Sequence, residues 1–131
     1  MACWRNKGVP SMKIILLIIV LLVSSPSQSE TFDTNEKFLL AASTSALVAD
    51  WAQTRWISKN YDRGYYETNP YLGEYPTTNE VNRYFLGLLT IQTLLNIYGN
   101  EYTRWSVNFS VLTVHGRATY RNYKIGIGMD F

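Results

Sequence analysis

The chain has 131 residues, of which 47% are hydrophobic, a formal net charge of +2 and a single cysteine, Cys3. This length allows one domain with a small core. A leader that we expect to be removed carries Cys3 and three of the twelve basic residues, which leaves nine basic residues against ten acidic ones. The remaining chain therefore lacks disulfides, thiolate metal ligands and the clustered positive charge that binding to nucleic acid requires.

The first 29 residues have the three-part layout of a secretory signal peptide. Basic residues precede an unbroken apolar run over residues 14–23, and Ser27 and Ser29 suit a peptidase that cleaves before Glu30. The run rises about 15 Å as a helix, half of a ~30 Å hydrocarbon core, so it is too short for a good membrane span. We predict a signal peptide over residues 1–29, with Met12 as an alternative start, and one domain over residues 30–131. An uncleaved signal anchor is the alternative.

Three helices are predicted, over about residues 36–58, 79–98 and 101–122. The second is the best defined, because Thr77 and Glu80 form a capping-box pattern before it and Gly99 follows it. The third is ambiguous, because Trp105 and Phe109 fit both the alternation of a strand and the spacing of a helix. We predict a helix there.

The two remaining segments differ from the helices. Residues 59–78 combine glycine and proline with five tyrosines, which favours an irregular, packed lid or a segment at a membrane-water boundary. Residues 123–131 alternate apolar with polar or glycine residues, which predicts a short strand-like tail.

The helices are apolar enough to suggest a membrane. Stretches of 20, 18 and 16 residues are near or slightly below the length of a span. Lys and Arg cluster after the first and third helices, which fits the positive-inside rule if the mature N-terminus lies outside. We predict an all-α, three-helix hairpin-type bundle embedded in the inner membrane. A periplasmic domain and an outer-membrane location are the alternatives.

A polar group in the first predicted helix is the best candidate site. Asp50, Gln53 and Thr54 lie within one turn, so a carboxylate, an amide and a hydroxyl share a face. A carboxylate buried in or near a membrane is a candidate proton carrier or cation ligand, although it can also serve only to fix packing. Glu67 in the tyrosine-rich segment is a second candidate, which would act with Asp50 as a general acid or base if the two met.

Other chemistry has little support in the sequence. His115 is the sole histidine, and no H-E-x-x-H pattern supports a metal site with Asp50 and Glu67, so we predict neither metal nor cofactor. There is also no nucleophile elbow, phosphate-binding loop or dinucleotide fingerprint. The sequence thus identifies no reaction.

The segments ADWAQTR, YETNPYLGEYP, VNRYF and RNYKIGIGMDF together resemble an uncharacterised family of small exported envelope proteins of Gram-negative bacteria and their phages. The resemblance covers most of the predicted mature chain and brings no activity with it. It implies that the polar residues of these segments form one unit and that His115 is outside the pattern. With Thr54 from the helix face, the predicted polar cluster is Asp50, Gln53, Thr54, Glu67, Asn69, Asn82, Arg121 and Asn122.

We therefore expect a small cell-envelope membrane protein with a structural or interaction role, with lipid and other envelope proteins as its partners. One alternative is a membrane enzyme or proton-linked subunit that uses Asp50 and Glu67. Another is a soluble periplasmic binding module whose ligand surface is the tyrosine-rich segment.

Overall fold

The computed structural model describes residues 32–131, and the predicted signal peptide lies outside this range. Its regular structure consists of α2 (Thr34–Ser58), a 3-10 turn η1 (Tyr61–Arg63), α3 (Thr78–Tyr98) and α4 (Glu101–Lys124). The described residues contain no strand. The predicted all-α bundle of three helices is therefore confirmed, and each helix begins and ends within two residues of the predicted position.

Each helix begins at a side-chain cap. Asp33 and Thr77 form capping boxes with Glu36 and Glu80, and the Asn100 side chain accepts a backbone N–H three residues further on. These caps satisfy N–H groups that have no partner within the helix. The capping box predicted at Thr77 is confirmed, and the segment with the ambiguous pattern forms the long helix α4.

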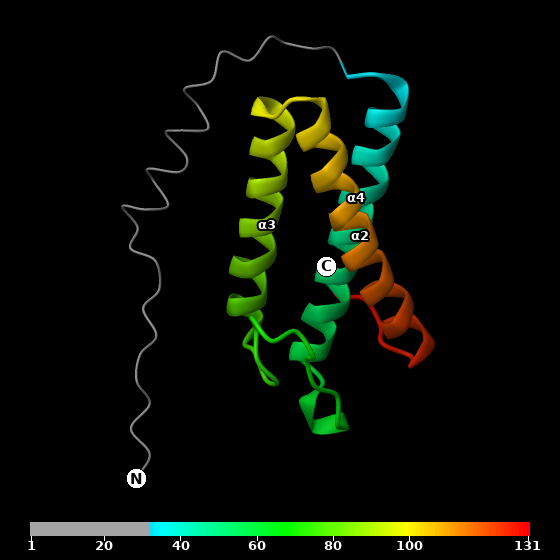
Figure 1. Cartoon of the computed structure of the whole chain (residues 1–131). Coiled ribbons are helices and arrows are strands. Elements are labelled where there is room, and N and C mark those ends of the chain that lie inside the picture. Colours follow the sequence, from blue (N-terminus) through cyan, green and yellow to red (C-terminus); the bar gives the residue numbers. More distant parts are fainter. Residues whose placement is uncertain (1–31) are drawn as a thin grey trace, which may run out of the picture.

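The three helices run alongside one another, and α3 and α4 form an antiparallel hairpin through a tight turn at Gly99 and Asn100 (Figure 1). The contact between α2 and α4 is the most extensive in the bundle. The chain between α2 and α3, with η1, forms a lobe at one end of the bundle (Figure 1).

A small apolar core lies between α2 and α3 near this lobe. Leu47, Val81 and Phe85 are almost fully buried there. The Trp51 ring stacks nearly parallel to Phe85 at 6.3 Å, and Tyr84 meets Phe85 edge-on at 5.2 Å. Aromatic packing of this kind holds the start of α3 against the middle of α2.

The rest of the interior combines buried apolar side chains such as Leu39, Ala52 and Ile57 with a cluster of polar ones. Asn108 of α4 is at its centre, and its Oδ1 accepts hydrogen bonds from Gln92 Nε2 at 3.0 Å, Asn96 Nδ2 at 3.2 Å and Ser43 Oγ at 3.2 Å. Asn108 Nδ2 in turn donates to Asn96 Oδ1 at 2.7 Å. All four side chains are at most 4% exposed. Amide and hydroxyl groups, rather than aliphatic ones, therefore join the three helices at this level.

A buried ion pair closes the far end of the bundle. Arg104 Nε lies 2.7 Å from Glu36 Oε1, and both residues are only 4% exposed. Arg104 also donates to the carbonyl oxygen of Gly99 at 3.0 Å, and its guanidinium lies over the Phe32 ring. The pair joins the first turn of α2 to the first turn of α4.

The tail after α4 corrects one prediction. The strand predicted over residues 123–131 is wrong, because α4 continues to Lys124 and no neighbouring strand is available to pair with the remainder. The tail instead turns back along α2, where Asp130 N–H donates to the carbonyl oxygen of Ala52 at 3.0 Å. Its carboxylate lies 2.6 Å from Lys59 Nζ and 3.3 Å from Arg55 Nε. The hydrogen bond from Lys59 lowers the pKa of Asp130.

The outer side of α3 carries exposed aliphatic side chains among exposed polar residues such as Arg83, Thr90 and Thr93. Leu86, Ile91 and Ile97 are each more than half exposed. Within residues 32–131, none of the helices is both long and apolar enough to cross a membrane. The bundle thus combines a small apolar core with buried amide groups, and it leaves several aliphatic side chains of α3 exposed.

Candidate functional site

Asp50 of α2 and His115 of α4 form a buried pair in the half of the bundle next to the lobe. Asp50 Oδ2 lies 2.7 Å from His115 Nδ1, and each residue is 8% exposed. The His115 ring also meets Phe85 at 6.0 Å, an apolar contact that fixes its orientation. With a proton on Nδ1, the imidazole donates to Asp50 and keeps Nε2 as an acceptor.

His115 Nε2 has no hydrogen-bond partner among residues 32–131. The same is true of the Thr54 hydroxyl, which lies one turn of α2 beyond Asp50. Both residues line the same cleft. This leaves an acceptor and a hydroxyl available to a water molecule or a ligand.

The segment around Glu67 is folded on itself. Glu67 Oε1 accepts the backbone N–H groups of Thr68 and Asn69, both at 2.8 Å, and Glu67 N–H donates to the carbonyl oxygen of Glu74. Asn69 Oδ1 accepts Tyr71 N–H at 3.0 Å, the local turn that an asparagine before proline favours. Glu67 is only 8% exposed, and its second oxygen, Oε2, is buried without a hydrogen-bond partner.

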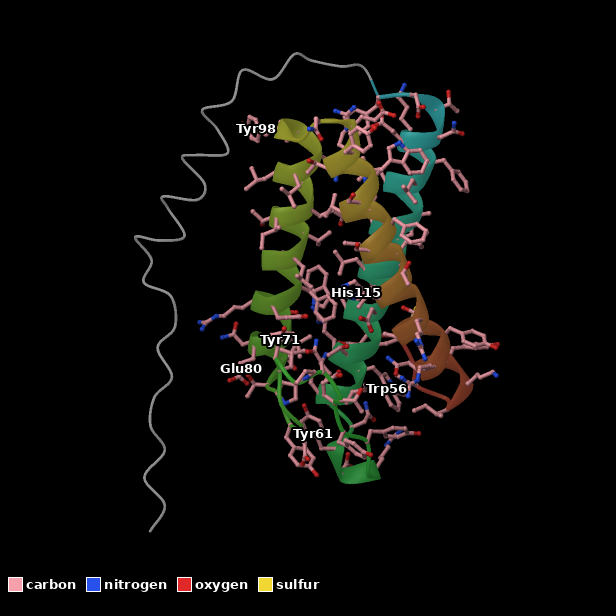
Figure 2. All side chains as sticks on the ribbon, viewed as in Figure 1. Trp56, Tyr61, Tyr71, Glu80, Tyr98 and His115 are labelled. Carbon is pink, nitrogen blue, oxygen red and sulfur yellow. The ribbon has the colours of Figure 1, made fainter. Side chains whose placement is uncertain are left out.

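We name the space between these groups the Asp50 cleft. It has a volume of about 590 Å³ and lies between α2, α4 and the Glu67 segment. Figure 2 shows His115 between the helices on the lobe side, with Tyr71 below it. The lining residues are Asp50, Thr54, Glu67, Thr68, Asn69, Pro70, Tyr71, Tyr84, Val114, His115, Ala118, Arg121, Asn122, Lys124 and Ile125.

The cleft contains six of the eight residues of the predicted polar cluster. These are Asp50, Thr54, Glu67, Asn69, Arg121 and Asn122. Gln53 is buried beside it, and its Nε2 donates to the carbonyl oxygen of Thr119 at 3.3 Å, which fixes α2 to α4. Asn82 lies elsewhere, because its Oδ1 accepts Trp51 Nε1 at 3.0 Å and an Arg55 nitrogen at 3.4 Å. Asn82 therefore serves the contact between α2 and α3.

The two predicted carboxylates share the cleft without a hydrogen bond between them. Asp50 bonds to His115, and Glu67 bonds to its own segment. Within residues 32–131, no three side chains of His, Cys, Asp or Glu are grouped so that they could hold a metal ion.

Aromatic side chains stabilise the lobe next to the cleft. The Tyr61 hydroxyl donates to the carbonyl oxygen of Pro76, and its ring meets Tyr75 edge-on at 5.2 Å. Trp56 meets Tyr65 edge-on at 4.9 Å. Burial, followed by the nearby negative charge of Glu67, raises the pKa of Tyr61 to about 12, so this hydroxyl stays protonated at neutral pH. The segment is thus anchored by Tyr61 and Tyr65, whereas Tyr66, Tyr71 and Tyr75 are more than half exposed.

No protein-family model matches the chain, and no curated protein or solved structure is significantly similar to it.

Sequence reasoning missed the partner of Asp50. His115 is 65 positions away, and residue spacing carries no information about which helices meet. One signal was present. His115 is the only histidine of the sequence, and a histidine on an apolar helix is a reasonable hydrogen-bond partner for a buried carboxylate.

Proposed function

We propose that the protein acts in the cell envelope with an interaction role, and that the outer side of α3 contacts lipid. The observation that carries this proposal is the polarity of the bundle. Asn108 and its amide partners are buried, whereas Leu86, Ile91 and Ile97 are exposed. Moving an exposed aliphatic side chain from water into acyl chains lowers the free energy by about 1.5–3 kcal/mol.

The leader supports the same location. A signal peptide cleaved before Glu30 would export the bundle, and the inner membrane is the lipid surface that it would meet first. The proposal that the bundle is embedded in this membrane rests on two features. These are the exposed Leu86, Ile91 and Ile97 of α3, and the basic residues after α2 and at the end of α4.

The expected result is that the protein pellets with membranes after carbonate extraction and binds phospholipid vesicles. Exchanging Leu86, Ile91 and Ile97 for asparagine should reduce the bound fraction at least tenfold, because three aliphatic side chains then lose their burial in lipid. Vesicle co-sedimentation measures this effect.

A matched control carries three asparagines on the exposed side of α4, at Ser106, Ser110 and Thr113. We expect this variant to bind vesicles like the wild type. Equal loss in both variants, or wild-type protein left in the carbonate supernatant, would contradict lipid contact through α3 and favour a soluble periplasmic module.

The Asp50–His115 pair favours one further candidate function, acid–base catalysis. A carboxylate that holds Nδ1–H leaves Nε2 able to take a proton from water, which is the arrangement of a general base. The catalytic candidates are then Asp50 and His115, and Glu67 remains in the same cleft without a described partner for Oε2.

If this candidate function is right, the protein should hydrolyse a short-chain p-nitrophenyl ester above the buffer rate. His115→Gln should lower that rate on the order of 100-fold, because general-base catalysis contributes about 10²–10⁴. The release of p-nitrophenol is followed spectroscopically. A rate that His115→Gln leaves unchanged would exclude His115 as the base for this model reaction.

A further inference from the structure

The charge layout of the Asp50 cleft points to a class of ligand. Two carboxylates, Asp50 and Glu67, line the cleft and are 8% exposed, and the imidazole of His115 lies between helices beside Asp50. The cationic lining residues, Arg121 and Lys124, are exposed at its rim. The interior of the cleft is therefore acidic and its rim is basic.

The second oxygen of Glu67 is the clearest unmet requirement in the cleft. Oε2 is buried and accepts no hydrogen bond within residues 32–131, while Oε1 already accepts two backbone N–H groups. A buried carboxylate oxygen left without a donor costs free energy, so a native structure usually provides a partner for it. No described side chain supplies that donor.

Two further acceptors lie in the same cleft. The hydrogen bond between Asp50 and His115 uses Oδ2, and Asp50 Oδ1 makes no hydrogen bond with a described residue. His115 Nε2 is likewise without a described partner. An ammonium group has three N–H donors and a positive charge, and it thus matches a set of acceptors that includes two carboxylates.

The rim has the opposite character. Arg121 makes no ion pair with any residue in the range 32–131. Lys124 lies over the Tyr120 ring, with Nζ 4.9 Å from the ring centroid, and it has no carboxylate partner in the described chain. Guanidinium and ammonium groups at the mouth of a cleft are suited to a phosphate.

We propose that the Asp50 cleft binds an aminoalkyl phosphate, with its ammonium group at Asp50 and Glu67 and its phosphate at Arg121 and Lys124. A volume of about 590 Å³ lies within the range of ligand pockets, about 300–1,000 Å³. The shared chemistry is that of phosphoethanolamine, either as a free metabolite or as a phospholipid headgroup. The site is assigned from the cleft alone and does not depend on lipid contact through α3.

The test is a calorimetric titration of the protein, purified from cells that express the full chain. The probes are glycerophosphoethanolamine, ethanolamine and inorganic phosphate, each titrated separately. We expect glycerophosphoethanolamine to bind at least tenfold more tightly than either fragment, because only this probe engages both ends of the cleft. Absence of binding, or phosphate that binds as tightly, would overturn the proposal.

Glu67→Gln is the decisive variant, because it removes one negative charge from the cleft with little change in shape. It should weaken binding of glycerophosphoethanolamine at least tenfold. Glu74→Gln makes the same change on an exposed residue of the same segment and should leave the affinity within twofold. Equal affinities in these two variants would refute the assignment.

A second variant tests the proposal independently in case Glu67→Gln does not fold. Arg121→Gln changes an exposed side chain that makes no described ion pair, so the fold should be retained, and we expect weaker binding of glycerophosphoethanolamine with unchanged binding of ethanolamine. Unchanged binding of both probes would mean that Arg121 does not bind the phosphate, and this result would overturn the proposal.

Vesicles distinguish the two sources of the headgroup. If vesicles of phosphatidylethanolamine compete with the soluble probe and vesicles of phosphatidylglycerol do not, the ligand is a lipid headgroup. If neither competes, the site takes the free aminoalkyl phosphate. Both outcomes retain the site, and a failure of lipid contact through α3 would leave the binding of the soluble probe intact.

Discussion

Replacing Arg104 with methionine is expected to lower the free energy of unfolding by about 3–5 kcal/mol, because it leaves the Glu36 carboxylate buried without its partner. Both residues are only 4% exposed, and the two charged atoms lie 2.7 Å apart. The variant also loses the hydrogen bond to the Gly99 carbonyl oxygen. Thermal unfolding followed by circular dichroism measures the change.

Arg55→Met is the control, because Arg55 likewise pairs with a carboxylate, that of Asp130, but in a partly exposed setting; the variant also loses the 3.4 Å hydrogen bond to Asn82. Its side chain is 22% exposed and that of Asp130 is 27% exposed. Surface pairs of this kind contribute about 0–1 kcal/mol. If both variants lowered the free energy of unfolding by a similar amount, burial of Glu36 and Arg104 would not explain the stabilising effect of their ion pair.

The same pair predicts a pH dependence. The hydrogen bond from Arg104 lowers the pKa of Glu36 below its ordinary value of 4.5. A carboxyl whose pKa is lower in the folded state contributes stability above its unfolded pKa, and this contribution is lost as the pH falls through the folded pKa. The stability difference between the wild type and Arg104→Met should therefore narrow below about pH 4.5.

Asn108→Leu is expected to destabilise the bundle by about 2–5 kcal/mol, although the two side chains are similar in shape. The substitution removes the acceptor shared by Gln92, Asn96 and Ser43 and the donor to Asn96. Asn96 Oδ1 is then buried without its donor, whereas the Gln92, Asn96 and Ser43 donors each lose one acceptor and keep another. A buried polar group left unpaired costs about 1–3 kcal/mol, and the lost hydrogen bonds add to this. Urea unfolding of the purified variant gives the loss.

Thr113→Val provides the comparison on the same helix. Its hydroxyl donates only to the carbonyl oxygen one turn earlier and is exposed. A surface change of this kind should stay within about 0.5 kcal/mol. If Asn108→Leu were as mild as this control, the buried amides would contribute little net stability, and the polar interior would need another explanation.

The three helices could be predicted from the sequence because the signals are local. Thr77 and Glu80 mark the start of α3, and Gly99 marks its end. The polar cluster was predicted largely from the resemblance and the helix face, and six of its eight residues line the Asp50 cleft. Whether these residues act together in binding remains a prediction.

The remaining features depend on contacts between distant segments. The pairing of Asp50 with His115 joins two helices across 65 positions, and no spacing rule specifies it. The strand prediction for residues 123–131 is wrong because alternation of apolar and polar residues also fits an extended segment that has no strand to pair with. The resemblance to the envelope-protein family places Asn82 with the cleft residues, whereas its hydrogen bonds go to Trp51 and Arg55.

The return of the tail along α2 also determines how this protein can be joined to others. Asp130 is held by its N–H and by its carboxylate, and a Cβ at Gly128 would lie 2.7 Å from Trp56 Nε1. Phe131, which follows Asp130, is 82% exposed. A reporter or affinity tag attached there begins one residue beyond an anchored position, so it needs a flexible spacer to avoid pulling Asp130 away from α2.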